Sequence, residues 1–255
     1  MRYLLAIIRL LIFGGILIFF IGRLLILSLF SGHNERRAML HRRQFIRVIL
    51  PVLGIRVHVK GRLPEDTGAA LFVSNHRSYL DPVVVLHDAL AHPVAKAEVA
   101  SWPLISQGVR LTGIIFVQRD EQGSRVAARK AIEQNLLAGK SIFICPEGTT
   151  HIYKKTVEFH KAAFYLAAAH DVPVYPTAVE YGEPDAAFIG KDKFLPHFMK
   201  LFGHWKIPIY VSFGPPLKNS DGGKLLQATQ NWIDQAGLEL QAKYGLNWLE
   251  DRPTD

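Results

Sequence analysis

The sequence contains one cysteine among its 255 residues, Cys145. A single cysteine excludes an intramolecular disulfide and cannot by itself form a multi-cysteine metal site. The 11 histidines include no pair in the H-E-x-x-H spacing of zinc proteases, and no serine stands in a G-x-S-x-G turn. The sequence therefore offers no disulfide framework, no recognisable metal motif and no nucleophile elbow.

Acidic residues are almost absent from the first 60 positions, where ten Lys and Arg residues stand against one acid, Glu35. The other 195 residues carry 20 basic and 21 acidic side chains, so the net charge of +8 originates in the amino-terminal part. A nucleic-acid-binding protein is expected to carry basic charge on its folded domain. Basic charge beside the most apolar part of the chain instead favours an anionic membrane surface, and we expect no nucleic-acid partner.

Residues 3–30 form a 28-residue apolar stretch that is interrupted only by Arg9 and Arg23. As a helix it would be roughly 42 Å long, at about 1.5 Å per residue. Its uninterrupted core, residues 10–22, is shorter than the roughly 20 residues that span a bilayer, so spanning requires both arginines to extend towards the headgroups. We predict a membrane anchor that is either a single span or a helix lying in one leaflet.

Residues 33–55 have the pattern of a second, interfacial helix, with apolar side chains among paired arginines. The apolar members are Met39, Leu40, Phe45, Ile46, Ile49 and Leu50. By the positive-inside tendency this side faces the cytoplasm. We therefore predict that residues 1–54 anchor the chain to the inner (cytoplasmic) membrane, with residues 55–255 on the cytoplasmic side.

From Ile55 onwards, short β-branched runs alternate with helical stretches. The runs predict strands within 55–61, 68–75, 113–119, 140–148 and 172–181. Helical patterns lie at 80–91, 122–138, 159–170 and 221–244. This alternation predicts one α/β domain, residues 55–255, with a mixed, largely parallel sheet flanked by helices. Pro173 and Pro176 predict that the last of these strands is an edge strand or a pocket wall.

The stretch "SNHRSYLD", residues 74–81, lies in a polar gap between two apolar runs. In one interpretation Asn75 and His76 cap the following helix, and Asp81 only occupies its first turn. In the other, Asp81 accepts the Nδ1–H of His76 and leaves Nε2 to accept a proton from a hydroxyl group. Because the chain has no nucleophile elbow, that hydroxyl would belong to the substrate; Ser74 and Ser78 are less favoured nucleophiles.

Four motifs in order make the chain resemble the 1-acylglycerol-3-phosphate O-acyltransferase family, within the lysophospholipid acyltransferase superfamily. They are N-H-x-x-x-x-D at 75–81, G-x-x-F-[IV]-x-R at 113–119, a version of F-P-E-G-T-R at 145–150 and V-P-[IV]-x-P at 172–176. The resemblance covers roughly residues 55–215, preceded by a membrane motif of the kind this family has. One H-x-x-x-x-D alone is a weak signal, whereas four ordered motifs are specific.

The resemblance implies that His76 is the general base and that Asp81 orients it. It also implies that Arg119 binds the phosphate of the acceptor, with Lys96 as a weaker candidate for the same group. Glu147 and Gly148 would shape the acceptor site, and Pro173 and Pro176 would line the acyl-donor side. The motifs add three further candidate substrate-binding residues, Asn75, Gly113 and Thr149.

Two positions depart from the family pattern. Cys145 replaces the usual phenylalanine, which we interpret as a buried apolar substitution. Thr150 replaces the usual arginine, and threonine cannot supply the charge and bidentate geometry with which arginine binds phosphate. Either Lys154 and Lys155 reach the same anion, or the acceptor has no phosphate, as in lyso-ornithine or lyso-glycine lipids.

We therefore predict a membrane-associated O-acyltransferase of phospholipid biosynthesis that moves a fatty acyl group from acyl-CoA or acyl carrier protein to a lyso-lipid hydroxyl. The first expected acceptor is 1-acylglycerol-3-phosphate, which would give phosphatidic acid, and a lyso-aminolipid is the alternative. A thiol leaves readily, so we expect no metal and no bound cofactor. The rival functions are a non-catalytic lipid-binding membrane protein and a lipid esterase that uses water.

Overall fold

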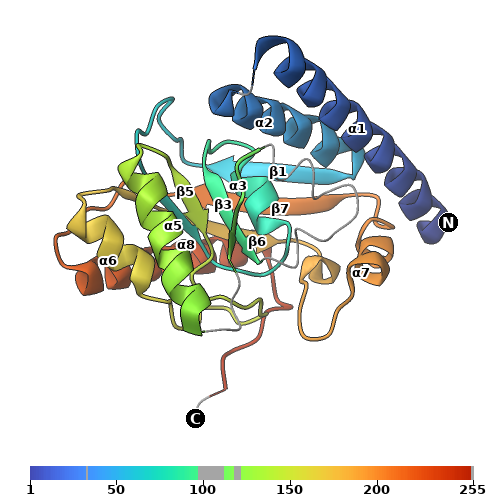
Figure 1. Cartoon of the computed structure of the whole chain (residues 1–255). Helices are drawn as coiled ribbons and strands as arrows, with labels where there is room; N and C mark the ends of the chain where they lie inside the picture. The colour runs from blue at the N-terminus through green and yellow to red at the C-terminus, as the bar shows by residue number, and fades with distance from the viewer. Residues whose placement is uncertain (33, 97–111, 118–121, 254–255) are drawn as a thin grey trace.

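The computed structural model describes residues 1–32, 34–96, 112–117 and 122–253. Their strands form one mixed, mostly parallel seven-stranded sheet in the order β1-β7-β6-β2-β5-β3-β4 (Figure 1). The strands are β1 (Ile55–Lys60), β2 (Leu71–Ser74), β3 (His92–Lys96), β4 (Ile115–Val117), β5 (Ile142–Ile144), β6 (Val174–Tyr181) and β7 (Ile207–Phe213). Only the β6–β7 pair is antiparallel, so β1 and β7 run against the other five strands. The predicted fold class is confirmed.

Helices cover both faces of this sheet, as a largely parallel sheet requires. One face carries α1 (Arg2–Ser31), α2 (Glu35–Val52), α3 (Asp81–Val85) and α7 (Phe194–Leu201), with the short 3₁₀ turn η2 (Pro184–Ala186) beside them. The other carries α5 (Gln122–Leu137), α6 (Ala162–Ala169) and α8 (Gly222–Tyr244). The sheet is thus buried between two apolar clusters, and every residue of β2 and β6 is buried.

Helix α1 lies along the domain, against α2 and α7 (Figure 1). The guanidinium of Arg9 donates to three main-chain carbonyls at the end of α7, those of Phe202 at 2.9 Å, His204 at 2.5 Å and Trp205 at 3.1 Å. Arg9 is only 7% exposed. It binds carbonyls of the segment that follows α7, so this arginine does not extend towards lipid headgroups.

The opposite face of α1 exposes large apolar side chains along its whole length. They include Leu4, Ile8, Leu11, Phe19, Ile26 and Leu29. By length and composition the helix can cross a membrane, and only 17% of its most apolar window is buried. An apolar surface of this extent indicates membrane association.

Five local expectations differ from the structure. The predicted helix at 80–91 is only Asp81–Val85, and strand β3, which follows it, was not expected. Strand β6 lies between β7 and β2, so the prediction of an edge strand is wrong. Pro176 is tolerated there because β7 ends at Phe213, opposite Thr177, and the Pro176 carbonyl still accepts the N–H of Gly214. Strand β7 and helix α7 were not expected.

Candidate active site

His76 and Asp81 meet just beyond the carboxyl end of β2. The Nδ1 atom of His76 lies 2.7 Å from Oδ2 of Asp81. The Asp81 side chain is completely buried, whereas the His76 side chain remains 21% exposed. An ionised carboxylate only accepts, so Nδ1 carries a proton, and in the neutral imidazole Nε2 is the acceptor. The hydrogen bond predicted for the catalytic interpretation is present.

Asp81 is held by three further donors, which fix the orientation of its carboxylate. The N–H groups of Arg77 and Ser78 donate to Oδ2 at 2.8 and 2.9 Å. The hydroxyl of Tyr181 donates to Oδ1 at 2.6 Å. Burial, together with the charge of Asp81, raises the pKa of Tyr181 well above its usual value, so the phenol stays protonated and keeps donating. Asp81 therefore offers one fixed lone-pair direction to His76.

The environment of His76 favours its protonated form. Burial opposes the charge, while the neighbouring Cys145 sulfur and the Asp81 carboxylate favour it, and the pKa of His76 lies well above its ordinary value. A charged imidazolium is thus stabilised at this position. To act as a base, Nε2 would first have to be unprotonated, which requires a pH high enough to leave it free.

The capping interpretation of the same stretch is wrong. Helix α3 has Leu80 as its N-cap residue and no side-chain cap. The Asn75 amide instead pairs with the backbone of Val179 in both directions, donating to its carbonyl and accepting from its N–H, each at 2.8 Å. Asn75 therefore ties the end of β2 to the middle of β6. Because it is buried and bound to β6 in this way, Asn75 supports the turn that carries His76.

Glu147 supports His76 from the neighbouring turn, which follows β5. Its Oε1 accepts the N–H of His76 at 2.6 Å, and its Oε2 accepts the N–H of Val157 at 2.8 Å. His151 accepts from the N–H of Tyr153 at Nδ1, so its Nε2 carries the proton that it donates to Oε2. Both carboxylate oxygens are thus engaged by the protein, and Glu147 positions the backbone of His76.

The rest of this turn lies beside the dyad. Gly148 has a φ of 69°, a left-handed conformation that favours glycine, and its N–H donates to the Cys145 carbonyl at 3.2 Å. Thr149 is exposed at the rim. The hydroxyl of Thr150, the residue that replaces the family's arginine, donates its hydrogen bond to the carbonyl of Phe188. Lys154 pairs with Asp251 at 2.8 Å.

Cys145 is partly exposed and lies beside the dyad. Its sulfur, a ring nitrogen of His76 and a carboxylate oxygen of Asp81 all lie within 4.8 Å of one another. The sulfur is also 3.5 Å from the hydroxyl of Ser74. Because Asp81 already accepts four donors, this group has little lone-pair capacity left for a metal ion. Cys145 is thus half-buried rather than buried, and it packs against the apolar cluster on the α2 face of the sheet, as an apolar substitution would.

Arg77 and Glu180 form a buried ion pair beneath the site, which sequence inspection missed. The guanidinium binds the carboxylate through two contacts of 2.7 Å, and both side chains are 1% exposed. Arg77 also donates to the carbonyl of Tyr153 at 2.8 Å. It thereby joins the His76 turn, strand β6 and the loop after Glu147. A charged residue inside a catalytic motif was the available signal, but its partner is 103 positions away.

The remaining predicted residues lie at both ends of the sheet, within strand β6, or outside the described residues. Gly113, with a φ of 76°, precedes the amino end of β4, and a Cβ there would meet the ring of His92 at 2.5 Å. Lys96 ends β3, opposite Val117. Pro173 precedes the amino end of β6, at the edge of the sheet opposite His76, and Pro176 pairs with Val73. Arg119 lies outside the described residues.

The site and fold define an acyltransferase, and comparison with known proteins agrees. The Acyltransferase family model matches residues 54–180. The chain is 32% identical over 208 residues to the lyso-ornithine lipid O-acyltransferase of Pseudomonas aeruginosa, covering 79% of this chain and 74% of that protein. The chain therefore belongs to the Acyltransferase family and is an acyltransferase enzyme, which argues against the non-catalytic alternative.

Other relatives carry two acceptor names. The lyso-ornithine lipid O-acyltransferase of Brucella abortus is 29% identical over 68% of this chain and 71% of its own length. A chloroplastic 1-acyl-sn-glycerol-3-phosphate acyltransferase of Arabidopsis thaliana is 30% identical over 50% of this chain and 36% of its own length. The crystal structure of the 1-acyl-sn-glycerophosphate acyltransferase of Thermotoga maritima superposes with a TM-score of 0.71 at 22% identity, covering 95% and 98% of the two chains, and confirms the fold.

Proposed function

We propose that this enzyme transfers a fatty acyl group from an acyl thioester, acyl-CoA or acyl carrier protein, to the free hydroxyl of a lyso-lipid. The observation that carries the proposal is the His76–Asp81 pair, with a buried carboxylate and a partly exposed imidazole. Such a pair activates a hydroxyl group, and the chain has no elbow serine to supply one. The acceptor's own hydroxyl is therefore the nucleophile.

The proposed reaction is a direct transfer. Nε2 of His76 takes the proton of the acceptor hydroxyl while its oxygen attacks the thioester carbonyl carbon. The resulting tetrahedral adduct collapses, the carbon–sulfur bond breaks, and the imidazolium returns the proton to the departing thiolate. Asp81 stabilises the imidazolium between the two steps. The balance requires no metal or bound cofactor.

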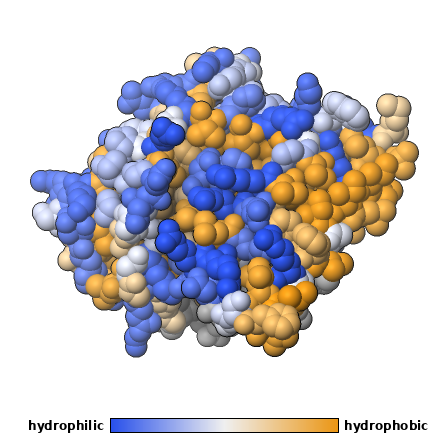
Figure 2. Space-filling view, turned by 90° about the horizontal axis from the view of Figure 1, so that it is seen from above, coloured by the Kyte–Doolittle hydropathy of each residue, from blue (hydrophilic) through white to orange (hydrophobic). Residues whose placement is uncertain are grey.

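The membrane pose follows from α1. Its outer face is apolar, and Arg9 is bound to carbonyls of the domain. We propose that α1 lies in one leaflet with this face in the lipid, since a helix fixed along the domain cannot also cross the bilayer. The view from above shows the apolar surface gathered on the side where α1 lies (Figure 2). The exposed arginines of α1 and α2, such as Arg2, Arg23 and Arg36, would then face anionic headgroups on the cytoplasmic side.

Two acceptors are supported. The family resemblance predicts 1-acylglycerol-3-phosphate, and relatives with that name match. Lyso-ornithine lipid is favoured by two specific observations: Thr150 brings no charge for a phosphate, and the relatives that match over 68–79% of the chain carry that name. On these grounds we place the lyso-ornithine lipid first in an acceptor screen, beside 1-acylglycerol-3-phosphate.

A panel of lyso-lipids with a long-chain acyl thioester tests this proposal. With lyso-ornithine lipid, we expect thiol release coupled to formation of acylated lipid. Fatty acid release without acylated lipid would instead indicate an esterase.

A Thr150→Arg variant should raise kcat/KM for 1-acylglycerol-3-phosphate, relative to that for lyso-ornithine lipid, by about tenfold, because a charge-assisted contact to phosphate is gained. Gln235→Arg, which adds the same charge on the exposed face of α8, should leave the ratio unchanged.

A further inference from the structure

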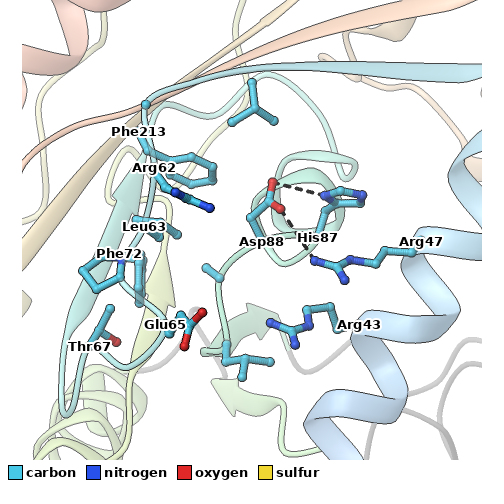
Figure 3. Close-up of a pocket in the computed structure, with 15 residues that line it drawn as sticks. Arg43, Arg47, Arg62, Leu63, Glu65, Thr67, Phe72, His87, Asp88 and Phe213 are labelled. Atoms are coloured by element: carbon cyan, nitrogen blue, oxygen red, sulfur yellow. Dashed lines mark ion pairs between the residues drawn. The ribbon is translucent and has the colours of Figure 1, made fainter.

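A cavity of about 380 Å³ lies at the edge of the sheet opposite His76 (Figure 3). Its walls come from α2, from the segments that precede β2 and β3, and from the ends of β1 and β7. The catalytic residues, in contrast, follow the carboxyl ends of β2 and β5. The cavity is therefore separate from the site of acyl transfer.

Three arginines face this cavity, which we call the arginine cavity. Arg43 and Arg47 project from α2 one turn apart, and Arg62 approaches from the loop between β1 and β2 (Figure 3). Asp88 lies 3.9 Å from Arg47 and 3.1 Å from His87. Among the described residues, neither Arg43 nor Arg62 has a hydrogen bond or ion pair. Glu65, which is exposed, is the other acid of the lining.

The three arginines of this lining outnumber its two acids, Asp88 and Glu65. Arg43 and Arg47 repel each other, as like charges four positions apart on a helix do, and Arg43 is only partly exposed. Burial first, and then the charge of Arg47, lowers the pKa of Arg43, with Asp88 acting in the opposite direction. A planar guanidinium matches two oxygens of a phosphate, and arginines from two separate elements can grip one phosphate from both sides. A bound phosphate would offset the repulsion.

The cavity belongs to the layer of the molecule that faces lipid. Helix α2, which carries Arg43 and Arg47, packs against α1 and exposes Leu40 and Val48 itself. A phosphate presented beside an apolar surface is the chemistry of a phospholipid headgroup. We propose that the arginine cavity binds the phosphate of an anionic phospholipid of the surrounding membrane, distinct from the lyso-lipid that is acylated.

Binding of monomeric short-chain lipids to the purified full-length protein in detergent tests this proposal, without any acyl donor. The probes are dihexanoyl phosphatidylglycerol, dihexanoyl phosphatidylcholine and inorganic phosphate, measured by calorimetry. We expect phosphatidylglycerol to bind at least about tenfold more tightly than phosphatidylcholine or inorganic phosphate. The Arg43→Gln/Arg62→Gln variant should lose about tenfold or more of that affinity, and Glu65→Gln should gain affinity because it removes a facing carboxylate.

The Arg36→Gln/Arg56→Gln variant is the matched control, since it removes the same charge from exposed arginines outside the cavity. An equal loss in this control would overturn the proposal in favour of general electrostatic attraction. Equal binding of the two lipids would overturn it as well, and phosphate binding as tight as phosphatidylglycerol would refute the lipid as occupant. If the double variant unfolds, an unchanged affinity in Glu65→Gln still overturns the proposal. None of these outcomes depends on acyl transfer.

Discussion

Replacing His76 by alanine is expected to lower kcat by about 10²- to 10⁴-fold while the protein stays folded. This corresponds to about 3 to 5 kcal/mol of lost transition-state stabilisation. The imidazole is the group that takes the hydroxyl proton. Among the described groups that donate to Asp81, only His76 can act as a base. The measurement is thiol release with saturating acyl thioester and acceptor, accompanied by thermal unfolding to verify the fold.

Asp81→Asn should be nearly as damaging, because an amide neither stabilises the imidazolium nor fixes its tautomer. His160→Ala serves as the matched control: His160 is exposed, its only described hydrogen bond is made by the main chain, and its loss should leave kcat unchanged. More than a tenth of wild-type turnover in His76→Ala would defeat the assignment. Full activity in Asp81→Asn would reduce Asp81 to an acid at a helix start.

Replacing Arg77 by methionine is expected to lower the free energy of unfolding by about 3 to 5 kcal/mol. The substitution keeps most of the apolar volume but leaves the charge of Glu180 buried without its partner. It also frees the carbonyl of Tyr153, so the loop that carries Glu147 loses a tie to the His76 turn. Denaturant unfolding monitored by circular dichroism measures the change, and kcat should fall as well.

A second substitution separates the buried charge from simple loss of packing. In Arg77→Met/Glu180→Gln the uncompensated charge is removed, so the double variant should be more stable than Arg77→Met alone. Lys60→Met, which breaks an exposed ion pair to Glu239 at 2.9 Å, should change stability little. If Arg77→Met and Lys60→Met unfold at the same denaturant concentration as the wild type, the buried pair has no structural role.

The catalytic pair was predictable because both of its members lie in one short stretch of sequence. A strand end followed by a polar turn and a helix start brings residues 76 and 81 together whatever the rest of the fold does. The amphipathic α5 and α8 were likewise predictable from their spacing, and their observed bounds agree with the expected ones within one or two residues.

The missed elements share a proline near their start. Pro93 is the second residue of β3, Pro208 the second of β7 and Pro196 the third of α7. Proline argues against a strand or helix interior, but it is tolerated in the first turn or first residues of an element. These three segments are stabilised by tertiary packing, which a local pattern does not show.

Contacts between distant segments could not be predicted at all. Tyr181 reaches Asp81 across 100 positions, and Glu180 reaches Arg77 across 103. Both depend on β6 lying directly beside β2, which is a property of sheet order. The same holds for the hydrogen bond that Glu147 accepts from the N–H of His76, 71 positions away. Its role in shaping the acceptor site stays a prediction.

Mixing the enzyme with a labelled acyl thioester, with and without a lyso-lipid acceptor, tests the direct transfer most simply. Intact-mass analysis follows the protein while thiol and acyl-lipid are counted in a single turnover. With acceptor present, we expect one thiol and one acylated lipid together, and without it neither thiol nor a heavier protein. A protein that gains the mass of the acyl group before acceptor is added, whether on Cys145 or a serine, would contradict proton transfer from the lipid hydroxyl to His76 as the step that begins the reaction.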